Sequence, residues 1–143
     1  MTVNLKAAGA PQIQIQRPDP EYRAGACNIG HDEIRKRWRF GHEMALFALV
    51  LFAVLVFVHA PALLRFIIAA PVAVSAACYL EAALRFCVRF GMNGLFNFGG
   101  LGSTGTVADQ MARARDRRRA IQLSSASLVV ALLVGTVAVL LPF

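Results

Sequence analysis

Three long apolar runs, separated by polar segments, dominate the pattern of hydrophobic and polar positions. Each run lacks Asp, Glu, Lys and Arg, and the second extends to residue 84 if Glu81 is accommodated. The runs cover residues 44–64, 66–80 and 123–143. A helix needs about 20 residues, at about 1.5 Å each, to cross a hydrocarbon core of about 30 Å. The pattern therefore predicts three transmembrane helices, at about 43–61, 63–84 and 122–142.

Composition favours an all-α polytopic membrane protein over a soluble domain. The 143-residue chain is 57% hydrophobic and 16% charged, whereas soluble domains average about 45–50% apolar and about 25% charged residues. Helices buried in a soluble protein would show polar faces at helical period, and the first and third runs have almost none. We therefore assign residues 31–143 to a three-helix membrane domain.

Two basic clusters predict the orientation. One precedes the first span and the other precedes the third, and their members are Arg35, Lys36, Arg37 and Arg39, and Arg113, Arg115, Arg117, Arg118 and Arg119. Because two spans separate the clusters, both lie on the same side, which the positive-inside bias places in the cytoplasm. The C-terminus is then outside. The preference for Arg over Lys indicates a bacterial source, and hence the bacterial inner membrane.

The net charge of +7 predicts an anionic partner. The second basic cluster would lie along an anionic leaflet, where each Arg contributes about 1 kcal/mol of attraction near the surface. We therefore expect Arg113, Arg115, Arg117, Arg118 and Arg119 to contact lipid headgroups and to retain bound phospholipid. No nucleic-acid partner is expected, because the chain has no recognisable nucleic-acid fold and no aromatic residues within the basic run.

A loop rich in glycine and arginine, residues 91–120, separates the second and third spans. Gly100, Gly102 and Gly105 match the G-x-G-x-x-G spacing of dinucleotide sites, but no strand pattern precedes them and no acidic residue follows about 20 positions later. The match is therefore attributed to chance. The sequence 106–109 resembles a capping box, which predicts a helix that starts at about Val107 and continues through the arginines.

Small residues at spacing four predict how the spans associate. The second span carries Ala69, Ala73 and Ala77, and the third carries Ser127, Ala131 and Gly135. In lipid, helices associate through close contact of such residues, so the two rows are expected to pack against each other or against a partner. The first span is bulkier and suits lipid or a loosely fitted partner.

Ionisable residues give no catalytic or metal constellation. The acid within a span, Glu81, lies four residues before Arg85, and this spacing predicts an ion pair on one helix face. The three histidines are scattered, and Cys27 and His31 are too few ligands for a zinc site. We therefore expect a protein that is not an enzyme, without a metal or an assigned cofactor.

Residues 1–30 are predicted to form an extended or disordered cytoplasmic arm. The segment contains three prolines and an alternating run of Gln and Ile at 12–16. Its apolar content is too low for a core of its own. The alternation could add an edge strand to a neighbouring protein.

The functional hypothesis is a non-catalytic subunit that packs into a larger inner-membrane complex of the respiratory, photosynthetic or secretion type. Its partners would be other membrane subunits or copies of itself. One alternative is a pigment- or haem-binding subunit that uses His59, whose position is similar to that of the pigment-ligating histidine in light-harvesting polypeptides. Another is a small self-associating channel or transporter, with a polar path from serines of the third span.

Overall fold

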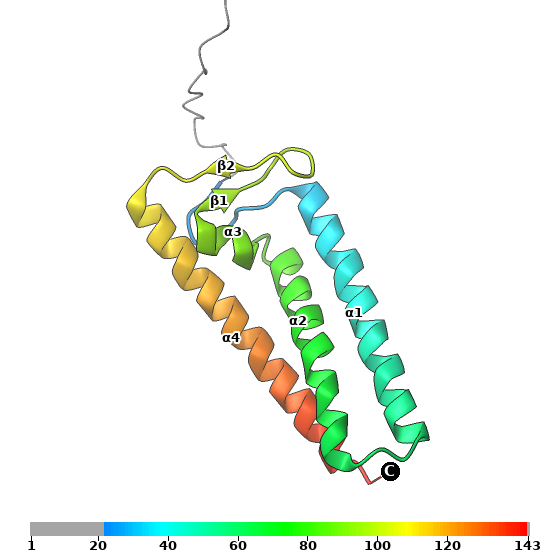
Figure 1. Cartoon of the computed structure of the whole chain (residues 1–143). Helices are drawn as coiled ribbons and strands as arrows, with labels where there is room; N and C mark the ends of the chain where they lie inside the picture. The colour runs from blue at the N-terminus through cyan, green and yellow to red at the C-terminus, as the bar shows by residue number, and fades with distance from the viewer. Residues whose placement is uncertain (1–21, 143) are drawn as a thin grey trace, which may run out of the picture.

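The computed structural model describes residues 22–142. Its elements in order are α1 (His31–Phe57), the 3-10 helix η1 (Ala62–Ile68), α2 (Ala69–Ala83), α3 (Val88–Asn93), β1 (Leu95–Phe96), β2 (Gly105–Thr106) and α4 (Gln110–Leu140). Helix α2 lies between α1 and α4, while α3 and the strands gather at one end of the three long helices (Figure 1). We call residues 22–30 and 85–109 the head.

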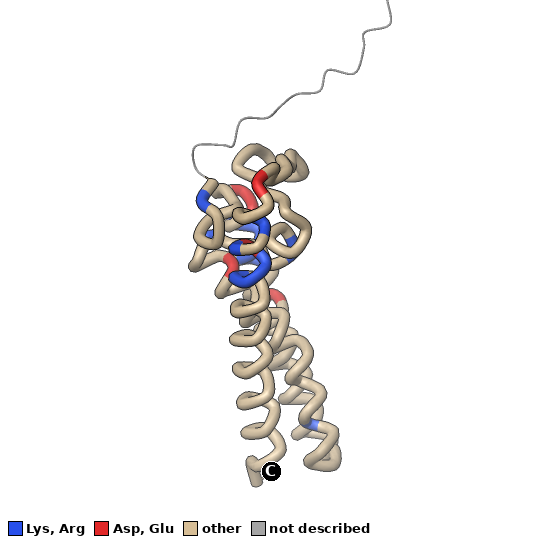
Figure 2. Tube along the Cα trace, turned by 90° about the vertical axis from the view of Figure 1, so that its left-hand side faces the viewer, with Lys and Arg blue, Asp and Glu red and all other residues tan. Residues whose placement is uncertain are grey.

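Three helical segments are long and apolar enough to cross a membrane, as the sequence predicts. They are His31–Phe57, Ala62–Ala83 and Gln110–Leu140. The first and third extend well beyond the apolar runs at their N-terminal ends, so that their basic turns reach the head. Figure 2 shows that most charged residues gather in and beside the head, and the opposite half of the molecule is almost free of charge.

Helix α1 ends where the backbone turns left-handed at His59. This residue has φ 52°, and the amide of Ala60 donates to Leu55 O at 2.9 Å. A left-handed residue followed by such a bond is the usual C-terminal helix stop, and His adopts this conformation more readily than most residues other than Gly. Pro61 then forms the N-cap of η1, and Pro71 lies in the first turn of α2, where its missing N–H is not needed.

Helices α1 and α2 approach closely at Gly41. A Cβ at Gly41 would lie 3.1 Å from the Tyr79 ring and 3.3 Å from the Cβ of Cys78. The Ser75 hydroxyl donates to Gly41 O at 2.9 Å. The first span therefore also presents a small residue to its neighbour, although its sequence suggested only bulky contacts.

The predicted rows of small residues meet between α2 and α4. A Cβ at Gly135 would lie 3.0 Å from the Cβ of Ala69 and 2.9 Å from the Phe66 ring. Ser127 and Ala131 are also buried, and Ala73 and Ala77 are half-buried. The contact between these two helices is thus within one chain. At the end opposite the head, Arg65 is buried and donates to Leu141 O at 3.1 Å, which links η1 to the C-terminal end of α4.

Helix α4 starts three residues later than the capping-box pattern predicts. Its N-cap is Asp109, whose carboxylate accepts from the amides of Met111 and Ala112. The preceding Thr106 instead lies in β2, where it pairs with Leu95. The acid of the motif therefore caps the helix itself, because a short hairpin takes up the threonine.

The head departs from the sequence predictions in two respects: the all-α fold class and the extent of the N-terminal arm. Strands β1 and β2, of two residues each, form an antiparallel pair. Residues 22–30, assigned by sequence to the arm, belong to the folded domain, because Asn28 and Ile29 are fully buried. Residues 1–21 of the predicted arm fall outside the described residues.

Candidate functional site

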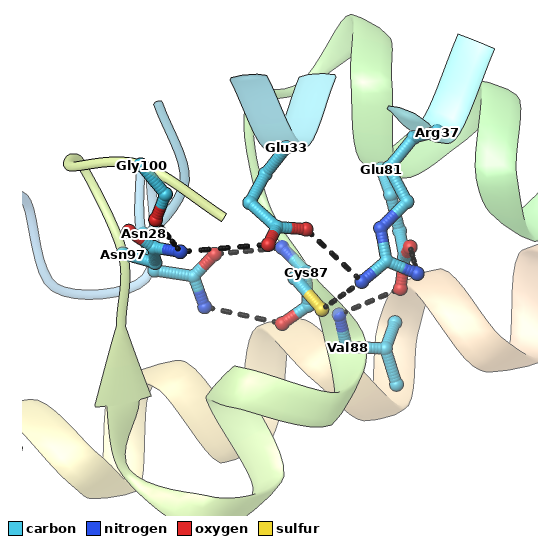
Figure 3. A network of polar contacts seen from close by, with 8 residues as sticks. All are labelled: Asn28, Glu33, Arg37, Glu81, Cys87, Val88, Asn97 and Gly100. Carbon is cyan, nitrogen blue, oxygen red and sulfur yellow. Dashed lines mark hydrogen bonds and ion pairs between the residues drawn. The ribbon is translucent and has the colours of Figure 1, made fainter. Parts of the chain in front are cut away.

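A buried polar cluster joins the head to the three long helices (Figure 3). Its side chains are those of Asn28, Glu33, Arg37, Glu81, Cys87 and Asn97. Glu33 and Arg37 come from the first turns of α1, Glu81 comes from the end of α2, and the others come from the head. Buried polar groups of this kind are costly unless each finds a partner, so the partners decide what the cluster can do.

Arg37 occupies the centre of the charged part of the cluster. Its Nη1 lies 3.1 Å from Glu81 Oε2, and its Nη2 lies 3.9 Å from Glu33 Oε2. The same Nη2 donates to Cys87 Sγ at 3.0 Å. The second carboxylate oxygen of Glu81 accepts from the Val88 amide at 2.8 Å. The guanidinium therefore links α1 to the end of α2 and to the start of α3.

Two asparagines connect head segments that are distant in sequence. The Asn28 side chain donates to Cys87 O at 3.1 Å and accepts from the Cys87 amide at 2.6 Å. The Asn97 amide donates to Asn28 O at 2.9 Å, and its side chain donates to Gly100 O at 3.2 Å. Gly30 is needed beside them, because a Cβ there would lie 3.0 Å from the backbone of Phe98.

Asp116 attaches residues 22–25 to α4. It is fully buried, and its carboxylate accepts from the Tyr22 hydroxyl at 2.7 Å and from the Gly25 amide at 2.6 Å. Burial, and then the hydrogen bond to Asp116, raise the pKa of the Tyr22 phenol well above its ordinary value of about 10. Tyr22 therefore remains a hydrogen-bond donor at neutral pH.

The cluster is suited to a structural role, as a joint between the head and the three long helices. Each of its carboxylates accepts hydrogen bonds or faces Arg37, and both asparagines bond to backbone groups. Burial raises the pKa of the Cys87 thiol, and the neighbouring Glu81 carboxylate raises it further, so the sulfur stays a thiol at neutral pH and is a poor nucleophile. Among the described residues, no group of three or more His, Cys, Asp and Glu side chains could hold a metal ion.

The ion pair predicted between Glu81 and Arg85 is replaced by the pair between Glu81 and Arg37. The i, i+4 spacing requires a helix through both residues, but α2 ends at Ala83. Arg85 adopts a left-handed φ of 54°, and the Phe86 amide donates to Glu81 O at 2.9 Å. The helix thus stops between the two side chains, and Arg85 is exposed.

The other predicted site residues lie at the two ends of the molecule. His59 is exposed in the turn after α1, where its backbone ends the helix. Four of the five α4 arginines are exposed, and Arg119 is half-buried. The side chain of Arg113 donates to Val107 O, so this arginine also supports the head. The structure does not bring His59 and the arginines together.

An apolar groove runs between α1 and α4 over one face of α2. Its volume is about 420 Å³. Ala45 and Ala48 of α1 and Ala76 of α2 line it with small side chains, and Val130, Val134 and Val137 line it from α4. Its polar lining residues are Ser75 and Tyr79, and the Ser75 hydroxyl already donates to Gly41 O.

Sequence reasoning missed Asn28, Asn97, Asp116 and Gly41. The signal for Asp116 was available, because a single acid within a run of arginines on a predicted helix needs an explanation. The two asparagines carry no local signal, since their partners are far away in the chain. No protein-family model, curated protein or solved structure matches this chain, so its function has to be inferred from these contacts.

Proposed function

We propose that this chain is a non-catalytic subunit of a larger membrane complex and that a transmembrane helix of a partner protein docks in the groove between α1 and α4. The observation that carries the proposal is the groove itself. Helix α2 lies between α1 and α4 and contacts both (Figure 1), and the groove lies over one of its faces. A further helix on that face would complete a four-helix arrangement.

The lining of the groove suits a helix better than lipid chains. Helices in a bilayer associate by close approach of backbones over small residues, and Ala45, Ala48 and Ala76 provide such a surface. The stretches 45–52 and 130–137 each extend about 10 Å, or two helical turns. The side chains of one face of a partner helix would therefore fill the groove.

A non-catalytic role agrees with the way the polar groups are used. The buried acids and amides of the cluster stabilise the joint between head and helices. Their polar atoms are already bonded within the chain and are therefore not available to bind a substrate. A rigid joint of this kind would hold the head at a fixed depth and angle beside the partner. The complex would then gain a scaffold on the head side of the membrane.

The proposal includes the orientation predicted from sequence, with the head in the cytoplasm of a bacterium and the C-terminus outside. It is supported by the position of the basic residues, which gather in and beside the head (Figure 2). Alkaline phosphatase fused to the C-terminus should be active in living cells, and the same enzyme fused to the N-terminus should be inactive. The reverse pattern contradicts the orientation but not the docking groove.

Filling the groove tests the docking proposal. Ala76→Leu places a larger side chain in the groove, and Ala70→Leu makes the same change at an exposed position of α2. Both variants would be purified in mild detergent from the native membrane, with a photo-reactive residue at Val134 to crosslink whatever occupies the groove. We expect Val134 to crosslink to one membrane protein in the wild type and in Ala70→Leu, and to lose that product in Ala76→Leu.

Three outcomes would count against the subunit role. One is a monomer that crosslinks only to lipid at Val134. Another is equal crosslinking of Ala76→Leu and Ala70→Leu to the same protein, because binding would then not use the groove. A third is crosslinking to a second copy of this chain alone, which would indicate a homo-oligomer in place of a larger complex.

A further inference from the structure

A second cleft lies between the N-terminal half of α1 and the loop that joins β1 to β2. Its volume is about 620 Å³. Six of its lining residues lie on α1, and the seventh, Leu101, comes from the loop. They are Asp32, Arg35, Lys36, Arg39, Phe40, Glu43 and Leu101. The lipid contacts predicted from sequence lie on α4, and this cleft is separate from those arginines.

The charges of the cleft favour an anion. Arg35 is engaged with Asp32 at 2.8 Å. Among residues 22–142, no hydrogen bond or ion pair engages the side chain of Lys36 or Arg39. These two residues lie three apart on one helix and therefore share a face. An anion between them would meet two cations that have no other partner in the described chain.

The apolar side chains of the cleft indicate that this anion is part of a lipid headgroup. Phe40 is 44% exposed and Leu101 is 61% exposed, so the cleft combines two free cations with two large apolar side chains in water. Arg39 lies about 6 Å and Lys36 about 10 Å along α1 from residue 43, where the predicted span begins. The cations are thus at headgroup depth or just above it.

We propose that this cleft binds the headgroup of an anionic phospholipid from the leaflet on the head side. Lys36 and Arg39 hold the phosphate, and Phe40, one turn closer to the membrane than Lys36, contacts the glycerol backbone. Leu101, in the loop on the head side, packs over the headgroup. The binding is independent of the partner in the groove and of the orientation across the membrane.

Native mass spectrometry of the full chain tests the proposal. The protein would be released from nanodiscs that contain equal amounts of phosphatidylglycerol, phosphatidylethanolamine and phosphatidylcholine. We expect one phosphatidylglycerol to remain bound to the wild type. Lys36→Gln/Arg39→Gln should weaken its binding by roughly 10- to 30-fold, since each cation near an anionic surface contributes a factor of several.

The matched control is Arg23→Gln/Arg89→Gln, which removes the same charge from exposed positions of the head. It should leave the retained lipid in place, whereas Leu101→Ser should weaken retention without changing the charge. Leu101 lies on an exposed loop, so this variant still provides a test if the double substitution on α1 does not fold. Four outcomes would overturn the proposal: equal loss in both double variants, no loss in Leu101→Ser, preferential retention of phosphatidylethanolamine or phosphatidylcholine, or complete displacement of the lipid by millimolar inorganic phosphate.

Discussion

Replacing Arg37 with Met removes the guanidinium that lies between Glu33 and Glu81 and keeps an unbranched side chain. At the 3.1 Å that separates Arg37 Nη1 from Glu81 Oε2, two unit charges attract by roughly 5 kcal/mol at an effective dielectric constant of about 20. Desolvation offsets part of this attraction, but a buried carboxylate without its partner costs about 3–5 kcal/mol. We expect Arg37→Met to lose that much free energy of unfolding.

A double-mutant cycle distinguishes this loss from a simple loss of packing. Glu81→Gln keeps an oxygen for the Val88 amide and removes the negative charge. If the unpaired carboxylate is the cause, Arg37→Met/Glu81→Gln should be more stable than the sum of the two single changes predicts, by about 1–3 kcal/mol. The assay is reversible unfolding of the full chain in detergent, followed by circular dichroism. Additivity within about 0.5 kcal/mol would refute the reasoning.

Three further predictions concern the head. Because the pKa of Tyr22 is raised on folding, its contribution to stability is fully present below pH 10 and is lost as pH rises above that value. The difference in Tm between wild type and Tyr22→Phe should therefore be constant from pH 7 to 9 and shrink above pH 10. A difference that stays constant to pH 11 would contradict this. Cys87 is fully buried and Cys27 is only half-buried. The rate of maleimide labelling should therefore be at least about tenfold lower in a variant that retains only Cys87 than in one that retains only Cys27. Equal rates would show that the head opens readily. Arg85→Gly relieves the left-handed backbone and should raise the free energy of unfolding by about 1 kcal/mol relative to Arg85→Ala, whereas equal stability of the two variants would place the strain elsewhere.

The apolar runs were sufficient to predict the three long helices, because length and hydrophobicity alone determine which segments can cross a bilayer. The contact between Ala69 and Gly135 was also accessible from sequence, since small residues at spacing four mark close helix contacts. Both inferences use information that is local to one helix.

The head could not be predicted in the same way. Its contacts join Asn28 to Cys87 and Asn97, and each of these residues looks like an ordinary loop residue in its own neighbourhood. The error at Glu81 has a related cause. The i, i+4 rule supplied a nearby partner, Arg85, but the helix ends between the two residues, and the true partner, Arg37, comes from another helix.

The junction at Asn28 also has a consequence for biosynthesis. The N-terminal segment of this junction leaves the ribosome first, yet the residues that enclose it, Cys87 and Asn97, leave the exit tunnel only after two hydrophobic helices. Until then, Arg37 has no Glu81 and must stay hydrated at the membrane surface. The nascent chain should therefore insert α1 in a provisional position and fix its depth only when the later segments arrive.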